Sequence, residues 1–443
     1  MIRYRARYVV PITTAPIVDG VVAVDDGRIA YVGPRDTAPR AEEINLGDAL
    51  LLPGLVNAHC HLELTAMRGF LEDLDFRSWI LRLTAAKRSV LSREMLLDAA
   101  RYGIAEGLRH GITTYADTCD SGVALDAMRE CGVRGIVFQE VFGPDPAQCG
   151  SALAELRAKL DHMRPLQTPL VHVGVSPHAP YTVSDSLFAA VASYARAESL
   201  PIAIHIAESQ LEHDLVAAGS GAFADGLRAR GIGVAPRART PIELLSALNV
   251  LDARTLLIHC VRVDNADVAR IAAARCTVAH CPASNAKLGH GIAPLAMLLG
   301  AGIRVGIGSD SMASNNQMDL LEEARLAALL QRAAHGDFRE ASAEQVLTLA
   351  TFGSAEALRL ESEVGSLEVG KAADLAAFPV DITGPVFDPV TTAIFALPGT
   401  RASFVAVAGN VLVRDGILLG EEPSLEQRVQ QSARALETWL QTS

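Results

Sequence analysis

Between residues 50 and 310 the sequence alternates eight apolar segments of strand length with longer stretches of helical spacing, such as 92–110 and 183–199. The eight segments are 50–59, 111–118, 134–140, 170–177, 201–208, 255–260, 276–281 and 303–310. Strands that alternate with helices favour a parallel sheet, and eight such units predict an α/β fold of the (β/α)8 (TIM) barrel type. An open doubly wound sheet is the alternative, but no G-x-G-x-x-G motif follows an early strand.

The two ends of the chain share a different pattern. Residues 21–34 and 404–420 are short β-branched runs interrupted by Asp-Gly or Gly-Asn, which is typical of antiparallel hairpins. The 443 residues also exceed the ~100–200 of one ordinary domain. We therefore predict a small β-sandwich domain built from both termini, residues 1–52 and 366–443, and a barrel domain over residues 53–365.

Charge and composition exclude several classes of partner. The formal net charge of −12 disfavours binding to phosphate backbones or anionic lipid. No apolar run of ~18 residues is present, and the first 20 residues lack the apolar core of a secretory signal. Seven cysteines, several of them in apolar runs, predict reduced, buried thiols. We expect a cytoplasmic protein that binds neither nucleic acid nor membrane.

Ionisable side chains recur where the predicted strands end. His59 and His61 end the first of them, and the others at or just after strand ends are His178, His205, Glu208, His259, His280 and Asp310. In a (β/α)8 barrel the carboxyl ends of all strands meet at one mouth, where the active site lies. These residues are therefore expected to converge, although they are distant in sequence.

The composition of this set favours a divalent metal. Neutral imidazoles and a carboxylate suit Zn²⁺ or Fe²⁺. His59 and His61 are two apart on a strand and so can face the same side, and His205 and Asp310 could complete the set. A single histidine at a strand end is ordinarily just a hydrogen-bonded polar group, so the ordered series carries the interpretation. His280 is expected to bond a loop, and His110, His162, His213 and His290 to be solvated.

Several other residues keep two interpretations. Glu63 is either a substrate contact or an ion-pair partner of Arg68. Trp79 either stacks on a substrate ring or packs inside a short helix. Arg68, Arg77 and Arg82 either meet a carboxylate tail of the substrate or are ordinary exposed arginines.

Motifs spread over nearly the whole chain resemble the amidohydrolase superfamily. They are "PGLVNAHCHLELTAMRG", "SPHAPYTVSD", "HIAES", "LIHCVRVD", "VAHCPASNAKLGHGIAPL", "GIGSDSMASNN" and "GSLEVGKAADLAAF". The combination is similar to the metal-dependent aminohydrolase branch, which includes S-adenosylhomocysteine/methylthioadenosine, aminodeoxyfutalosine, guanine and cytosine deaminases and the chlorotriazine hydrolases.

The resemblance implies a set of site residues. One metal, Zn²⁺ with Fe²⁺ as the alternative, would be held by His59, His61, His205 and Asp310. The resemblance gives Glu208, His259 and Asp310 catalytic roles and places His178, with Glu63, Arg68 and Trp79 as further candidates, near the substrate. Dinuclear relatives carry a bridging lysine at the end of the fourth strand, which this chain lacks, so one metal is favoured. Glu140 either bridges metals, as a carboxylate there does in some relatives, or binds substrate or a loop.

The implied activity is hydrolytic release of ammonia from an aminated heterocycle, most simply an adenine nucleoside such as S-adenosylhomocysteine, methylthioadenosine, adenosine or aminodeoxyfutalosine. The alternative is hydrolysis of another ring substituent, of the guanine, cytosine or s-triazine type. A catalytically inactive scaffold is disfavoured because every ligand position is filled. The resemblance also implies a homodimer or larger homo-oligomer.

Overall fold

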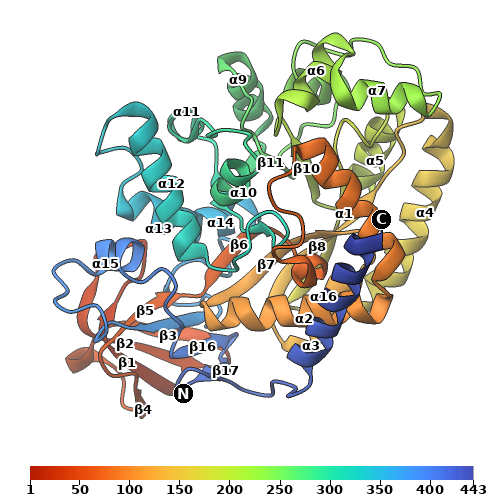
Figure 1. Cartoon of the computed structure of the whole chain (residues 1–443). Coiled ribbons are helices and arrows are strands. Elements are labelled where there is room, and N and C mark those ends of the chain that lie inside the picture. The colour runs from red at the N-terminus through yellow and green to blue at the C-terminus, as the bar shows by residue number, and fades with distance from the viewer. Residues whose placement is uncertain (443) are drawn as a thin grey trace.

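A closed parallel sheet occupies the middle of the chain in the computed structural model, which describes residues 1–442 (Figure 1). Its strands are β6 (Leu55–His61), β7 (Ile112–Cys119), β8 (Arg134–Val141), β9 (Val171–Pro177), β10 (Ile202–Ile206), β11 (Thr255–His259), β12 (Thr277–His280), β13 (Val305–Ile307) and β14 (Asp310–Ser311). β13 pairs with β12, and β14, three residues further on, pairs with β6, which closes the barrel. The eighth predicted strand is thus present in two pieces, and the (β/α)8 prediction is confirmed.

Helices surround this barrel and fill the connections between its strands (Figure 1). They are α1 (Phe76–Val90), α2 (Arg93–Arg109), α3 (Val123–Cys131), α4 (Cys149–Met163), α5 (Asp185–Ala197), α6 (Gln210–Ala218), α7 (Gly221–Ala229), α8 (Pro241–Ala247), α9 (Asn265–Ala274), α10 (Pro282–Lys287), α11 (Leu295–Gly300), α12 (Leu320–His335), α13 (Ala343–Leu349) and α14 (Phe352–Ala357). Four 3₁₀ turns complete the set: η1 (Arg35–Thr37), η2 (Leu62–Met67), η3 (Pro146–Gln148) and η4 (Arg164–Leu166).

The inside of the barrel is a packed hydrophobic cluster. It draws on β6, β7, β8, β10, β11 and β12 and includes Val56, Phe138 and Ile258. The hydroxyl of Thr277, at the start of β12, donates to the carbonyl of Ala357 at 2.7 Å, so α14 lies at the amino-terminal end of the strands. The carboxyl ends of the strands are left as the open mouth.

The first predicted strand, residues 50–59, is two strands in the structure. β5 (Ala49–Pro53) joins the sheet of the small domain, and β6 enters the barrel. The break lies at Pro53–Gly54, and a Cβ at Gly54 would lie 2.1 Å from Oγ1 of Thr113. The change of sheet therefore requires glycine at this close approach.

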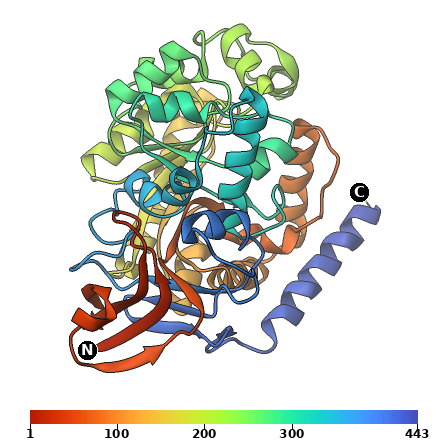
Figure 2. The same cartoon turned by 90° about the vertical axis from the view of Figure 1, so that its left-hand side faces the viewer.

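A second sheet joins both ends of the chain, as predicted. Its other strands are β1 (Ile2–Val9), β2 (Ile17–Asp25), β3 (Arg28–Pro34), β4 (Glu42–Asn45), β15 (Leu375–Pro379), β16 (Phe404–Val407), β17 (Asn410–Arg414) and β18 (Ile417–Leu418). β5 pairs with β15, so strands from the two termini lie side by side (Figure 2). The rings of Tyr4 and Phe404 are 4.8 Å apart although β1 and β16 are not neighbours, so this single sheet folds over its own core.

The terminal hairpins have the turns that their sequences predict. Asp26 and Gly27 join β2 to β3, and Asp415 and Gly416 join β17 to β18, all four with positive φ. Positive φ at both central residues is the requirement of a type I′ turn, for which Asp-Gly is a preferred pair.

The last segments of the chain do not all belong to the second sheet. Between β15 and β16 lies α15 (Pro389–Phe395). α16 (Leu425–Thr442) packs on α1, α2 and η2, and its Leu425 and Val429 contact Ala66 and Ala99 (Figure 1). Within residues 1–442 no helix is long and apolar enough to cross a bilayer. All seven cysteines are free thiols.

Candidate active site

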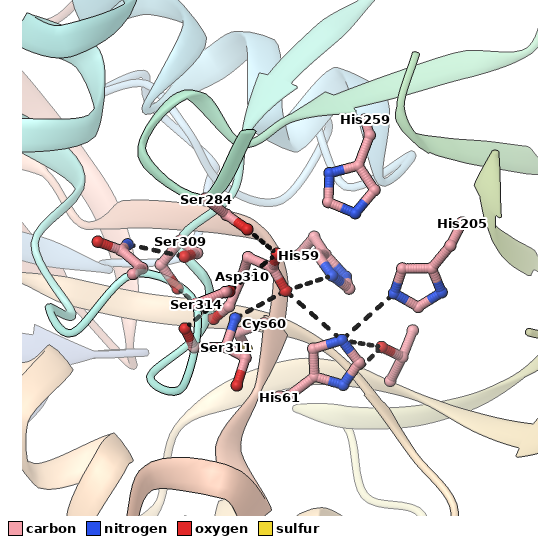
Figure 3. A network of polar contacts seen from close by, with 12 residues as sticks. His59, Cys60, His61, His205, His259, Ser284, Ser309, Asp310, Ser311 and Ser314 are labelled. Carbon is pink, nitrogen blue, oxygen red and sulfur yellow. Dashed lines mark hydrogen bonds and ion pairs between the residues drawn. The ribbon is translucent and has the colours of Figure 1, made fainter. Parts of the chain in front are cut away.

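Three histidines and one aspartate meet at the barrel mouth (Figure 3). Nε2 of His61 lies 3.2 Å from Nε2 of His205, and Oδ1 of Asp310 lies 3.3 Å from Nε2 of His59 and 3.6 Å from Nε2 of His61. Two nitrogen ligands ~2.0–2.1 Å from a tetrahedral Zn²⁺ are roughly 3.4 Å apart, which these separations approach.

The histidines of this cluster have ring nitrogens that no protein group satisfies. Both nitrogens of His59 and Nδ1 of His205 are buried without a hydrogen-bond partner in the described chain. Buried polar atoms are normally paired, so such atoms indicate that something other than protein binds here. The residues therefore fit a divalent metal.

The protonation states at this cluster also suit a metal. Burial lowers the pKa of His59, although Asp310 opposes the shift. Burial, with a contribution from His59, lowers the pKa of His61 to about 3, and burial and His178 put that of His205 well below its usual value. Burial would raise the pKa of Asp310, but the surrounding histidines outweigh it and hold it well below its usual range. The set is thus neutral imidazoles and a carboxylate, the forms that bind metal.

The strand pairing explains how Asp310 reaches the histidines. β14 pairs with β6 so that Asp310 lies opposite Cys60, between His59 and His61. Cys60 itself is fully buried in the main hydrophobic core. Oδ2 of Asp310 accepts hydrogen bonds from Ser284 (2.5 Å) and Ser314 (3.2 Å), which leaves Oδ1 for the histidine side. A Cβ at Gly308 would lie 2.9 Å from the His59 backbone, so the glycine of "GIGSDS" permits this approach.

Glu208 stands beside the cluster with two histidines around its carboxylate. Oε1 of Glu208 lies 3.2 Å from Nε2 of His290 and 3.6 Å from Nε2 of His259. Oδ1 of Asn285 lies 2.9 Å from Nδ1 of His259, so Nδ1 donates and Nε2 faces Glu208. Burial would raise the pKa of Glu208, but His259 and His290 outweigh it and lower the pKa. Glu208 is therefore ionised at neutral pH.

The backbone at this end of the barrel adopts unusual conformations. Ala207, His259, Cys260 and Asp310 all have positive φ, between 47° and 77°. Non-glycine residues rarely adopt such values. The residues that do are concentrated at functional sites, where the surrounding structure stabilises the unfavourable backbone conformation. The carboxyl group of Glu212 stabilises this backbone, because it accepts hydrogen bonds from the backbone N–H groups of Ala207 (3.0 Å) and Glu208 (2.8 Å).

A cavity of about 830 Å³ opens in front of these residues. One wall is aromatic: the rings of Tyr181 and Phe223 stack 4.3 Å apart, and Phe76 packs edge-on against both. Ligand cavities are typically ~300–1,000 Å³ and largely apolar with a few polar groups, so this one is of ligand size.

The structure excludes one of the two interpretations of Glu63, the ion pair with Arg68. Its carboxylate is bound by the ammonium group of Lys87 and by the Ser121 hydroxyl, and Lys87 also binds Asp120. Arg68 instead pairs with Glu106 and does not line the cavity. The ion pair between Glu63 and Arg68 is therefore not formed, and Glu63, Lys87 and Asp120 form part of the cavity wall.

Some of the remaining candidates for substrate contact line the cavity and others do not. Trp79 lines the cavity while stacked on Phe76, with ring centroids 6.1 Å apart and planes at 17°. Of the arginines considered besides Arg68, Arg77 lines the cavity and Arg82 does not. His178 lines it too, with its ring 4.8 Å from that of His205.

His280 and Glu140 are the two remaining residues for which the sequence predicts a role. His280 is buried outside the cavity lining, and burial lowers its pKa to about 4. Glu140 lines the cavity, and burial and Asp120 raise its pKa well above the usual value.

Sequence reasoning missed His290, which was expected to be solvated and is 4% exposed beside Glu208. The chain carries it there because α10 ends at Lys287 and the N–H of His290 donates to the carbonyl of Asn285 at 2.9 Å. The only signal in the sequence was its place in the motif "NAKLGHG". Lys87 was missed as well, since a lysine within a helical stretch is ordinarily exposed.

A (β/α)8 barrel whose mouth gathers three histidines and an aspartate around one point defines the class of metal-dependent barrel hydrolases. The chain belongs to the amidohydrolase family, whose model matches residues 50–422.

Comparison with individual proteins places the chain within this family. It is 33% identical to a 5-methylthioadenosine/S-adenosylhomocysteine deaminase of Moorella thermoacetica over 92% of this chain and 93% of the relative. Its structure resembles that of an adenosine deaminase from Xanthomonas campestris with bound zinc, at a TM-score of 0.88 and 29% identity over 99% of this chain and 98% of the other. It also resembles the zinc complex of atrazine chlorohydrolase from Arthrobacter aurescens, at a TM-score of 0.83 and 26% identity over 98% and 100%.

Proposed function

We propose that the protein is a metal-dependent deaminase that hydrolyses the amino group from the ring of an adenine nucleoside, such as adenosine, methylthioadenosine, S-adenosylhomocysteine or aminodeoxyfutalosine. The observation that carries the proposal is the position of Glu208: a buried carboxylate faces the histidine–aspartate cluster in one cavity, flanked by His259 and His290. The names of the relatives at 33% and 29% identity support the same reaction.

His59, His61, His205 and Asp310 are the proposed ligands of one divalent metal, Zn²⁺ with Fe²⁺ as the alternative. Such a metal supplies Lewis acidity, which lowers the pKa of a water molecule from 15.7 towards ~7. The zinc in two structurally similar proteins supports this choice of ion.

Two carboxylates then divide the proton transfers. Both are ionised at neutral pH, so Glu208 must first take a proton from the attacking water before it can donate one to the ring nitrogen beside the attacked carbon. Protonation of that nitrogen makes the carbon electrophilic, and a tetrahedral carbon forms. Asp310 accepts the second proton of the water and returns it to the exocyclic amine, which leaves as ammonia. His259, held by Asn285, orients the attacking oxygen.

The cavity wall supports a substrate larger than a free base. Phe76, Trp79, Tyr181 and Phe223 offer faces and edges on which a purine or an apolar substituent can pack. Arg77 is half-buried at the same cavity, where it can meet a carboxylate tail. His178 and Glu63 are the proposed polar contacts.

A second candidate is hydrolysis of a triazine substituent, which the similarity to atrazine chlorohydrolase favours. Glu208 and its flanking histidines favour the deaminase, because an amine leaves as a neutral molecule only after it has been protonated, whereas chloride needs no proton.

An ammonia-release screen tests the proposal. The metal-loaded protein is offered adenosine, S-adenosylhomocysteine, methylthioadenosine, aminodeoxyfutalosine, guanine, cytosine and triazines. Ammonia from the adenine nucleosides is the expected result, and no ammonia from any compound would overturn the deaminase assignment. Metal analysis of the same sample should find about one equivalent per chain.

The setting of the enzyme is also part of the proposal. We expect it in the cytoplasm, with small-molecule substrates only and as a homodimer or larger homo-oligomer. Light scattering of the purified protein checks the oligomeric state.

A further inference from the structure

Glu140, at the end of β8, is a cavity-lining carboxyl group for which the proposed reaction has no use. The residue is 6% exposed, and its Oε1 has no hydrogen-bond partner in the described chain. An unpaired buried acceptor destabilises the folded protein. Because the group faces a cavity of ligand size, a ligand is the natural source of its missing partner.

His178 presents a second unpaired acceptor next to Glu140. Its Nδ1 lies 2.8 Å from Oγ1 of Thr182, and that hydroxyl donates its own hydrogen to the carbonyl of Ala179 at 3.1 Å. Nδ1 must therefore carry the proton, which leaves Nε2 as a bare acceptor. Nε2 lies 4.0 Å from Oε1 of Glu140, too far for a direct hydrogen bond.

The other carboxylates on this wall already have partners. Lys87 and Ser121 bind Glu63, and Lys87 also binds Asp120. Each of these carboxylates therefore already has a donor, which Oε1 of Glu140 lacks. Glu140 and His178 thus face each other with unpaired atoms: burial and Asp120 raise the pKa of Glu140 well above its usual value, which favours its protonated form, and Nε2 of His178 is a bare acceptor.

A second metal is the competing explanation, because ligand atoms of Glu140, His178 and His205 lie within 4.8 Å of one another. His205 already belongs to the cluster with His59 and His61. Only two protein ligands would then remain for the second ion, whereas catalytic zinc sites have three. The geometry favours a ligand that brings hydrogen-bond donors.

We propose that Glu140 and His178 bind the vicinal hydroxyl groups of the substrate's sugar, so that Glu140 determines specificity for ribonucleosides over deoxynucleosides and free heterocycles. This inference rests on the proposed nucleoside deaminase function. A vicinal diol supplies two hydroxyl groups that both donate and accept: one donates to Nε2 of His178, and the other pairs with the carboxyl group of Glu140. Free bases and triazines have no hydroxyl groups to offer, so they would leave both Glu140 and His178 unpaired.

The test compares adenosine with 2′-deoxyadenosine and 3′-deoxyadenosine in the wild type, in Glu140→Ala and in the nearly isosteric Glu140→Gln. Glu437→Gln, at an exposed position of α16, is the matched control. The wild type and the control should prefer adenosine by roughly 10- to 100-fold in kcat/KM, the scale of leaving a buried polar group without its hydrogen bond. Glu140→Ala should lose that preference against the deoxynucleoside whose missing hydroxyl Glu140 binds, and Glu140→Gln should lose part of it. Metal content should stay at one equivalent in all four proteins.

Three outcomes would overturn the inference. If the wild type deaminates adenosine and Glu140→Ala and Glu140→Gln keep its preference, the inference fails while the proposed function stands. If metal content falls in the Glu140 variants, Glu140 is a metal ligand and not a sugar contact. If the wild type deaminates no nucleoside, the proposed function and the inference fail together.

Discussion

Nε2 of His290 lies 3.2 Å from Oε1 of Glu208, at the point where the cavity meets the histidine–aspartate cluster. His290 packs edge-on against Phe76, with ring centroids 4.6 Å apart, so an aromatic wall holds it in place. Glu208 thereby has a polar neighbour on each side, since His259 lies 3.6 Å from the same oxygen. The proposed proton-transfer group, Glu208, is therefore flanked by residues from two later segments of the chain.

Glu208→Gln should keep its metal and lose most of its turnover. The substitution preserves size and hydrogen bonding but cannot accept and donate a proton, and a general acid–base group contributes about 10²–10⁴-fold. The measurements are kcat for adenosine and metal content by elemental analysis, with Glu437→Gln as control. Normal turnover in Glu208→Gln would remove Glu208 from the mechanism.

His290→Gln should move the acidic limb of the kcat/KM profile to higher pH. His290 lowers the pKa of Glu208, so its removal raises that pKa and the carboxylate is lost at a higher pH as the solution is acidified. The measurement is kcat/KM against pH for wild type and variant. An unchanged acidic limb would mean that His290 serves only to pack against Phe76.

Removal of the metal should abolish activity and lower the melting temperature together. A ligand at 1,000 times its Kd stabilises the folded state by about 4 kcal/mol. Chelation and then addition of Zn²⁺ or Fe²⁺ should reverse both effects and distinguish the two ions. His59→Ala should resemble the chelated protein, whereas His162→Ala, at an exposed position, should resemble the wild type. Full activity after verified metal loss would contradict the ligand assignment.

Lys87→Met should destabilise the fold strongly, and Arg68→Ala should not. Loss of Lys87 leaves Glu63 with an uncompensated buried charge, which costs about 3–5 kcal/mol. Arg68 pairs with Glu106 at a partly exposed position, where an ion pair is worth about 0–1 kcal/mol. Urea unfolding of both variants measures the difference. The double variant Lys87→Met/Glu63→Gln should recover part of the loss, and equal stability of the two single variants would contradict the pairing.

Arg77→Ala should raise KM for S-adenosylhomocysteine, which carries a carboxylate, by about tenfold, equivalent to ~1.4 kcal/mol, and leave KM for methylthioadenosine nearly unchanged. Arg77 lines the cavity and Arg82 does not, so Arg82→Ala is the matched control. Steady-state kinetics with both substrates decide the matter. Equal effects on the two substrates would exclude a role for Arg77 in binding the tail.

His280→Leu should make the protein less sensitive to acid. The folded-state pKa of His280 is about 4 against an ordinary value of 6.5, so below pH 6.5 the unfolded chain takes up a proton that the folded chain does not. Stability contributed by this neutral histidine is therefore full above pH 6.5 and is lost as pH falls towards 4. At pH 5 the loss in the wild type is on the order of 2 kcal/mol.

Urea midpoints at pH 7 and pH 5 measure this difference, with His162→Leu as the exposed control. The fall between the two pH values should be smaller in His280→Leu than in the wild type and the control. An equal fall in all three proteins would show that His280 does not titrate in this range.

The pattern of strands, helices and turns was legible from the sequence because it depends on local periodicity. The alternation of apolar and helical segments predicted the barrel, and the Asp-Gly pairs predicted hairpins that form with positive φ. The sequence could not show that residues 50–59 divide between two sheets. That division depends on the approach of Gly54 to Thr113, 59 residues away.

The candidate ligands could be predicted for a related reason. In a barrel the order of strands follows the order of sequence, so residues at strand ends must meet, and His59, His61, His205 and Asp310 do converge. The residues around them lie in loops and on helix faces, whose direction local sequence does not set. Only the tertiary structure paired Glu63 with Lys87 and brought His290 to Glu208. The order of the strands determines where each strand end lies around the barrel mouth. Packing between distant segments decides which side chains fill the cavity in front of it.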